Sequence, residues 1–280
     1  KDFDRYWRGR KRALKKVPIK AELTPLPGKS KDGIDVYEIK IDCLGDSVRG
    51  YLSVPKNAAE KSLPAHAVFQ GYSVADMHYW PVADAVTVFV SPHSMDMGKD
   101  AAYYDALKKG RLAGFGFEKE LASPKDSYFD GMILRGLRAL EYLRSRPEWN
   151  GKDLSVSGGS MGGFQAIAMA ALDPKATKCK SSITWMCDLG GADAGRLGGW
   201  LPKYLPNRAY FDSANLGRRI KCPVEIDAGL GDYTCPPSGV TALYNGISAP
   251  KKITFTQGRT HGYTPPDSPA RYSRSGGGQK

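Results

Sequence analysis

Residues 154–172, LSVSGGSMGGFQAIAMAAL, decide the fold of this chain. The stretch begins with the short apolar segment Leu154–Ser157, passes through the glycine-rich turn Gly158–Gly163, and continues as a helical pattern to Leu172. Gly-x-Ser-x-Gly is a weak signal by itself, because short motifs recur by chance. A strand, a sharp turn and a helix in this order are the setting of a nucleophile elbow, where small residues let strand and helix approach. The stretch therefore predicts a turn that presents Ser160 as a nucleophile.

Two other interpretations of the turn stay open at this point. A glycine-rich connection between a strand and a helix can hold no ligand, or it can bind a phosphate at the helix N-terminus. The turn lacks the Gly-Lys-Ser/Thr end of a P-loop. Gly159 and Gly163 also go beyond what a simple turn requires, which favours the elbow.

Apolar strand patterns alternate with helical patterns on both sides of this stretch. Strands are predicted at Ala65–Phe69, Val86–Val90, Leu154–Ser157, Ser182–Met186, Val224–Ala228 and Ile253–Thr256, and helices at Tyr128–Leu143, Met161–Leu172 and Ser238–Ile247. Such alternation is typical of a parallel sheet with helices on both faces. The segments Asp35–Asp42 and Val48–Val54 predict a hairpin before it. We therefore expect an α/β fold with a mostly parallel central sheet and an N-terminal antiparallel hairpin.

The domain organisation follows from the same patterns. We expect one domain over residues 1–272, opened by a basic helix over 1–20 and followed by a disordered Gly/Ser/Lys-rich tail over 273–280. Two long segments, 92–125 and 188–221, interrupt the alternation of strands and helices. Loops of this length in a compact domain are usually functional, so we expect both excursions to line the site.

A serine nucleophile needs a base, and in the α/β-hydrolase fold the chain order is serine, acid, histidine. The chain has four histidines, and among them His261 alone follows Ser160. Six aspartates lie between the two. Asp232 lies in the turn after the strand Val224–Ala228, where an acid that orients the imidazole is expected. Asp227, within that strand, and Asp188, at the start of the second excursion, stay open as alternatives.

An esterase or peptidase of this kind also needs two backbone N–H groups that stabilise an oxyanion. One belongs to the residue after the nucleophile, here Met161, and the other to the loop after an early strand. The segment Phe69-Gln70-Gly71-Tyr72 follows the predicted strand Ala65–Phe69, and we expect the amide of Tyr72 to be the second donor. A plain strand-ending glycine turn is the alternative.

The net charge of +12 does not by itself indicate a nucleic-acid-binding protein, because more than half of it lies in residues 1–20. Apolar residues recur there at helical spacing, which is typical of an amphipathic surface helix with a solvated basic face; a polyanion-binding arm is the alternative. We expect no nucleic-acid partner. No apolar run approaches the roughly 20 residues that span a bilayer, so we expect no membrane partner either.

The five cysteines, Cys43, Cys179, Cys187, Cys222 and Cys235, include no Cys-x-x-Cys pair and no histidine at zinc-site spacing. We therefore expect no metal, and no cofactor is needed for the chemistry above. Five is an odd number, so at least one thiol is free or paired between chains. The first residue, Lys1, is not Met, which fits a processed export product; a secreted or periplasmic location is expected, with a cytoplasmic one as the alternative.

These residues, in this order, resemble the acetyl xylan esterase and cephalosporin C deacetylase family, carbohydrate esterase family seven. The likeness covers nearly the whole chain: it begins at KDFDRYW (1–7), continues through VRGYLSVP (48–55) and Gln70-Gly71-Tyr72, and is strongest at Gly158–Gly163 and at GLGDYTCPPS (229–238). Some positions depart from the family, which suggests a divergent branch. Ser91-Pro92-His93 replaces its Arg-Gly-Gln motif, and Met161 and Gly262 replace its Gln and Glu.

The resemblance implies an α/β-hydrolase fold, a catalytic triad of Ser160, Asp232 and His261, and a possible homo-oligomer. It also implies removal of acetyl groups from acetylated xylo-oligosaccharides or related small esters. Four side chains in or beside the excursions, Trp80, His93, Trp185 and Trp200, are candidate substrate contacts, with core or lid packing as the alternative for the tryptophans. A feruloyl esterase or prolyl-type peptidase on the same triad, or a non-catalytic carbohydrate-binding relative, stay open as other functions.

Overall fold

The computed structural model describes residues 2–31, 33–80, 82–114, 122–267 and 269–278. Its internal contacts divide the chain into two compact units, 1–118 with 127–155 and 119–126 with 156–280. The expected extent of one domain, 1–272, stays a prediction. Lys1, residues 115–121 of the first excursion and residues 279–280 of the tail lie outside the described residues.

The sheet of the first unit contains, in spatial order, β1 (Ala21–Pro25), β2 (Ile34–Ile41), β3 (Val48–Pro55), β5 (Val86–Val90) and β4 (Leu63–Phe69). The predicted hairpin is confirmed: β2 and β3 pair antiparallel, with Ile41 opposite Val48. β5 pairs antiparallel with β3 and parallel with β4. The unpredicted strand β1 is exposed at most of its residues, so it lacks the apolar alternation by which a strand is recognised.

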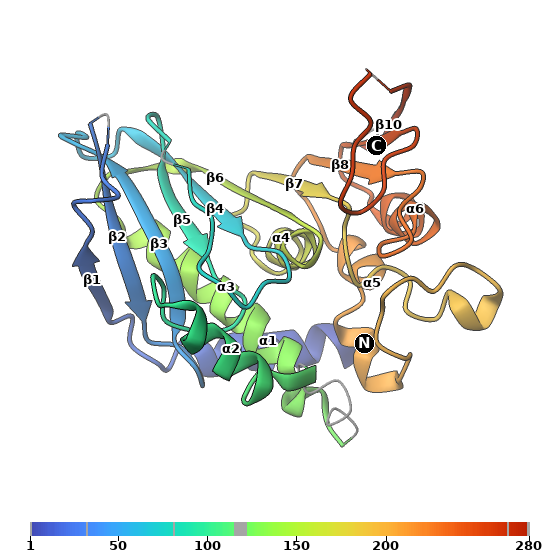
Figure 1. Cartoon of the computed structure of the whole chain (residues 1–280), viewed down its shortest axis with the longest axis horizontal. Coiled ribbons are helices and arrows are strands. Elements are labelled where there is room, and N and C mark those ends of the chain that lie inside the picture. Colours follow the sequence, from blue (N-terminus) through green and yellow to red (C-terminus); the bar gives the residue numbers. More distant parts are fainter. Residues whose placement is uncertain (1, 32, 81, 115–121, 268, 279–280) are drawn as a thin grey trace. The chain divides into compact units, whose positions relative to one another are not determined.

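The helices of the first unit, in its described residues, include α1 (Asp2–Leu14), α2 (Ala101–Lys109) and α3 (Tyr128–Ser145). α3 packs across β3, β4 and β5, and α1 packs against α3 (Figure 1). The helix expected over 1–20 ends at Leu14, and it buries Trp7 and Leu14 while its basic residues stay largely outside. An amphipathic helix is confirmed there.

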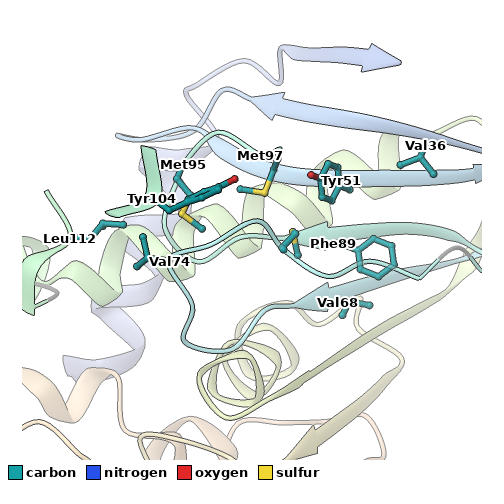
Figure 2. Close-up of a cluster of buried hydrophobic side chains, with 10 residues drawn as sticks. Val36, Tyr51, Val68, Val74, Phe89, Met95, Met97, Tyr104 and Leu112 are labelled. Atoms are coloured by element: carbon teal, nitrogen blue, oxygen red, sulfur yellow. The ribbon is translucent and has the colours of Figure 1, made fainter. Parts of the chain in front are cut away.

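The first excursion packs back onto the strands of its own unit. Figure 2 shows Met95, Met97 and Tyr104 lying next to Tyr51 of β3, within a buried cluster that also contains Val36 and Phe89. The Tyr51 hydroxyl donates to Asp76 Oδ1 at 2.6 Å. The described part of this excursion therefore contributes to the core of the first unit.

The longer segment of the second unit begins within β6 (Trp149–Gly159) and continues with α4 (Met161–Leu172). Its further strands lie in the order β7 (Lys178–Ser182), β8 (Val224–Gly229), β9 (Lys251–Thr256) and β10 (Arg271–Gly276). β7, β8 and β9 pair in parallel. Helix α4 packs on β7, and α5 (Ser213–Gly217) and α6 (Pro237–Gly246) pack together. Parallel strands joined through helices confirm the α/β class.

Two predictions in this unit are wrong. The strand expected at Ser182–Met186 is instead β7, which ends at Ser182, because Ile183 and Met186 have positive φ angles that a strand does not allow. The tail expected to be disordered from 273 contains β10, which pairs antiparallel with β9 (Figure 1). Composition missed this strand because backbone pairing, and not an apolar face, holds it; five of its six residues are exposed.

Two further findings concern the chain as described. All five cysteines are buried free thiols. Among the described residues, no helix combines the length and the apolar character that crossing a bilayer requires.

Candidate active site

Ser160 lies on a strained turn between β6 and α4. Its φ and ψ angles are 55° and −120°, a combination that non-glycine residues adopt rarely and at a cost. Three backbone hydrogen bonds hold it: its N–H donates to Ser182 at 2.9 Å, and its carbonyl accepts from Phe164 at 3.0 Å and Trp185 at 3.1 Å. The turn therefore has the geometry expected of a nucleophile elbow.

The glycines of the turn differ in what they allow. A Cβ atom on Gly163 would lie 2.6 Å from Ser181 Oγ, whereas one on Gly159 would find no atom closer than 3.8 Å. Gly163 therefore permits the close packing of α4 on β7. At position 159, by contrast, a Cβ atom would fit without a steric clash.

Ser160, His261 and Asp232 form a continuous chain of hydrogen bonds within the second unit. His261 Nε2 lies 3.0 Å from Ser160 Oγ, and His261 Nδ1 lies 3.0 Å and 3.2 Å from the two carboxylate oxygens of Asp232. The Asp232 side chain is fully buried, whereas the His261 side chain keeps 29% of its surface exposed. Serine, imidazole and carboxylate thus have the order and contacts of a hydrolase triad.

Backbone contacts orient the acid and the base. Asp232 Oδ1 accepts from the N–H groups of Thr234 and Cys235 at 2.9 and 2.8 Å, which leaves Oδ2 facing the imidazole. The loop that carries His261 is tied to the turn after β8, because Gly231 N donates to the Arg259 carbonyl at 2.9 Å. A side chain on Gly229 would overlap this same carbonyl. The glycines before Asp232 therefore allow the acid and base loops to meet.

The two alternative acids make other contacts. Asp188 forms an ion pair with Arg196, with Oδ2 2.6 Å from Nε. Asp227 lies in β8, where its carbonyl accepts from Ile183 N at 2.7 Å. Of the three candidates, Asp232 is the one whose carboxylate contacts His261.

Cys235 is a neighbour of the triad that the sequence did not single out. Its thiol contacts the Ser160 hydroxyl, and burial raises the pKa of that thiol. Asp232, Cys235 and His261 offer potential metal-ligand atoms within 4.8 Å of one another. Both imidazole nitrogens already have partners in Asp232 and Ser160, so the triad accounts for the arrangement without an ion. The one sequence feature that could have indicated Cys235 as a neighbour of the triad is its position three residues after Asp232.

Met161 and Tyr72, the expected oxyanion-hole residues, belong to different units. Met161 is the first residue of α4, and the first N–H groups of a helix have no acceptor within it. Its amide therefore suits an oxyanion next to Ser160. Tyr72 follows β4 by three residues, and its half-exposed ring meets that of His93 edge-on at 6.4 Å. A role for the Tyr72 amide stays a prediction.

The four candidate substrate contacts have different surroundings. Trp185 is 1% exposed and stacks on Trp200, which is 44% exposed, with ring centroids 5.6 Å apart. Trp185 thus supports Trp200 and has almost no surface to offer to a substrate. In the first unit, Trp80 is half exposed beside Phe89. His93 is buried there, with Nδ1 2.5 Å from Tyr128 Oη, so its ring also lacks an exposed face.

The chain is similar to known proteins in sequence and in fold. The chain is 28% identical over 276 residues to the acetyl esterase Axe7A of Xylanibacter ruminicola, covering 93% of this chain and 63% of that protein. The chain thus spans less than two thirds of that relative's length. An acetyl xylan esterase from Paenibacillus sp. R4 matches with a TM-score of 0.78 at 25% identity, covering 93% of this chain and 89% of that one. Acetyl xylan esterase 1 from Thermoanaerobacterium sp. JW/SL YS485 matches with 0.77 at 23%, covering 93% and 88%.

The similarity extends along nearly the whole sequence. The family model described as acetyl xylan esterase (AXE1) matches residues 1–192 and 203–272. The match spans both units. Together with the similarity in fold, it shows that the α/β architecture described above is that of an α/β-hydrolase. The chain belongs to the acetyl xylan esterase (AXE1) family of carboxylic ester hydrolases.

Proposed function

We propose that this protein is a serine esterase that removes acetyl groups from acetylated xylo-oligosaccharides or related acetylated sugars. The observation that carries the proposal is the hydrogen-bonded series from Ser160 Oγ through His261 to the buried carboxylate of Asp232. Membership of the acetyl xylan esterase family and the similarity to an acetyl esterase support the acetyl group as the one transferred.

The first half-reaction forms an acyl-enzyme. His261 Nε2 takes the proton of Ser160 as Oγ attacks the ester carbonyl carbon. The negative charge that develops on the carbonyl oxygen is stabilised by the Met161 amide; one such donor typically contributes about 3–4 kcal/mol. The protonated His261 then gives its proton to the alkoxide oxygen of the sugar as the carbon–oxygen bond breaks. The sugar leaves, and the acetyl group stays on Ser160.

The second half-reaction uses water as the nucleophile. His261 takes a proton from water, the resulting hydroxide oxygen attacks the acetyl carbonyl, and the Met161 amide again stabilises the oxyanion. The proton returns to Ser160 Oγ as the bond to acetate breaks. Throughout, Asp232 keeps the Nδ1–H tautomer of His261 and stabilises the imidazolium, because its own carboxylate is buried and held by two backbone amides.

The test compares the wild-type protein with Ser160→Ala on acetylated xylobiose, a feruloyl ester and a proline amide. We expect the wild type to release acetate and to react with a fluorophosphonate probe, and Ser160→Ala to do neither while keeping the same melting temperature. Hydrolysis of the amide or the feruloyl ester without acetate release would refute the proposed reaction. Substantial turnover by Ser160→Ala would refute the assignment of the nucleophile.

A further inference from the structure

Trp200 lies in a part of the second excursion that distinguishes this chain from its family. The family model matches residues 1–192 and 203–272, so residues 193–202 fall in the gap between the two matched segments. Trp200 is also one of the large apolar side chains that remain exposed in the second unit. An exposed tryptophan ring offers a flat apolar surface with a polar N–H at its edge.

The orientation of the Trp200 ring is fixed by Trp185. The two rings stack with an interplanar angle of 27°, and Trp185 Nε1 donates to the Trp200 carbonyl at 2.6 Å. Trp185 is buried and meets Phe164 of α4 edge-on at 6.2 Å. One face of Trp200 thus lies against a buried ring, and Trp200 as a whole remains 44% exposed.

Short backbone links connect this ring pair to the triad. The N–H of Trp185 donates to the Ser160 carbonyl at 3.1 Å, and the N–H of Trp200 donates to the Thr234 carbonyl at 3.0 Å. Thr234 N in turn donates to Asp232 Oδ1 at 2.9 Å. Gly199, with φ of +64°, allows this approach, because a side chain there would overlap Thr234 and Pro236. The exposed ring is therefore held by both the nucleophile turn and the acid loop.

Two more exposed aromatic side chains flank the acid and the base. Tyr233 directly follows Asp232, and Tyr263 is two residues after His261; both are more than half exposed. A pyranose ring presents flat faces of C–H groups with hydroxyls around its edge, and a tryptophan ring is a flat apolar surface of matching size. The tyrosine hydroxyls add hydrogen-bonding groups near the same loops.

From these observations we propose that Trp200, positioned by Trp185, stacks against the sugar ring of the substrate and selects acetylated carbohydrates over acetates of flexible alcohols. This inference rests on the proposed esterase function and names the residue that sets its substrate class. Trp185 acts here as a positioning residue, because its own ring is covered.

The first experiment measures selectivity. The ratio of kcat/KM on acetylated xylobiose to kcat/KM on n-butyl acetate is determined in a pH-stat for the wild type, Trp200→Ala, Trp200→Phe and Leu197→Ala. We expect Trp200→Ala to lower the ratio about tenfold through KM, since about 1.4 kcal/mol of stacking is a factor of ten. Trp200→Phe should retain most of the wild-type ratio, because a flat ring remains. Leu197→Ala, which removes a more exposed apolar side chain in the same segment, should leave the ratio as in the wild type.

The second experiment measures binding without turnover. Xylobiose and acetylated xylobiose are titrated into Ser160→Ala and into Ser160→Ala/Trp200→Phe, and tryptophan fluorescence is followed. We expect a saturable change that the double variant loses.

The two experiments separate the failure of this inference from failure of the proposed function. If the wild type releases acetate from acetylated xylobiose but Trp200→Ala lowers both kcat/KM values equally, the stacking role is wrong and Trp200 is structural. The inference would also be overturned if the fluorescence change on titration were the same in Ser160→Ala/Trp200→Phe as in Ser160→Ala. If no acetate ester is hydrolysed by the wild type, it is the esterase proposal that fails.

Discussion

At the scale of single residues, the site depends on a backbone conformation that costs free energy. The positive φ of Ser160 is unfavourable for a side chain with a Cβ, and it is maintained by hydrogen bonds to Ser182, Phe164 and Trp185. This conformation turns Oγ toward His261. Strain at one residue thus places the oxygen where a base can reach it.

The role of Asp232 can be tested by replacing it with an amide. In Asp232→Asn, the side-chain oxygen can still accept from Thr234 and Cys235, but the NH₂ group faces His261 and favours the wrong tautomer. We expect turnover to fall by about three to four orders of magnitude, with a small change in melting temperature. Steady-state kinetics with an acetyl ester measure this. Asp188→Asn is the control, since the carboxylate of Asp188 pairs with Arg196; a loss of activity there instead would mean that the acid is misassigned.

Two glycines of the same turn should respond differently to a methyl group. Gly163→Ala would place Cβ against Ser181 Oγ and 3.2 Å from the Ser182 carbonyl, so we expect a loss of about 1–3 kcal/mol in the free energy of unfolding. Gly159→Ala has its nearest atom at 3.8 Å and should change the free energy of unfolding by less than about 1 kcal/mol. Urea unfolding of both variants decides between them, and equal losses would contradict the packing explanation.

At the scale of elements, α1 is attached to α3 by a buried charge. Asp130 of α3 accepts from the Tyr6 hydroxyl at 2.5 Å and from the Arg10 guanidinium. At the C-terminal end of α1, Arg138 of α3 donates to the carbonyls of Leu14 and Val17 at 2.8 and 2.9 Å. The basic segment is therefore held by hydrogen bonds in the middle and at the C-terminal end of the helix, in addition to its buried Trp7.

Removing the buried carboxylate should detach this helix. Asp130→Ala leaves Arg10 and Tyr6 without their acceptor in a largely covered position, and we expect a loss of about 3–5 kcal/mol in the free energy of unfolding. Lys40→Ala breaks the exposed pair with Glu22 and should cost no more than about 1 kcal/mol. Denaturant unfolding gives both numbers; a cost for Asp130→Ala as small as that for Lys40→Ala would show that apolar contacts alone hold α1.

At the scale of the whole molecule, stability should depend on pH through a buried histidine. Burial, followed by the nearby guanidiniums of Arg135 and Arg111, lowers the pKa of His93 to about 3. Arg135 Nη2 donates to the Pro92 carbonyl at 2.6 Å, next to the Tyr128 hydroxyl that contacts His93. A further positive charge is therefore unfavourable at this position in the folded state.

The sign of the effect follows from the lowered pKa. Between about pH 6.5 and pH 3 the unfolded chain binds a proton at His93 that the folded protein does not, so stability falls as the pH falls through this range. From pH 7 to pH 5 we expect a loss of about 2 kcal/mol from this group. From pH 7 to pH 5, the free energy of unfolding of His93→Gln should therefore fall less than that of the wild type, by a difference of about 2 kcal/mol. An identical pH dependence of unfolding in the variant and the wild type would contradict this prediction.

Much of the fold and of the site could be predicted from local sequence. The strand, turn and helix around Ser160 were recognisable because their apolar pattern and glycines are local features, and the single downstream histidine restricted the base to His261. The strand Ser182–Met186 was misplaced because its apolar residues lie in a turn with positive φ angles. β10 was missed because its pairing with β9 is a backbone interaction, which composition does not reveal.

The sequence by itself determined the alternation of strands and helices, the family, and the identity of the serine and the histidine. Only the tertiary structure decided between Asp232, Asp227 and Asp188, since all three are carboxylates at plausible places in the chain and only one contacts the imidazole. It also decided that Trp185 is buried under Trp200. The physical reason is common to both: periodicity and composition specify which residues face a core, whereas contacts between loops depend on where the ends of distant strands meet.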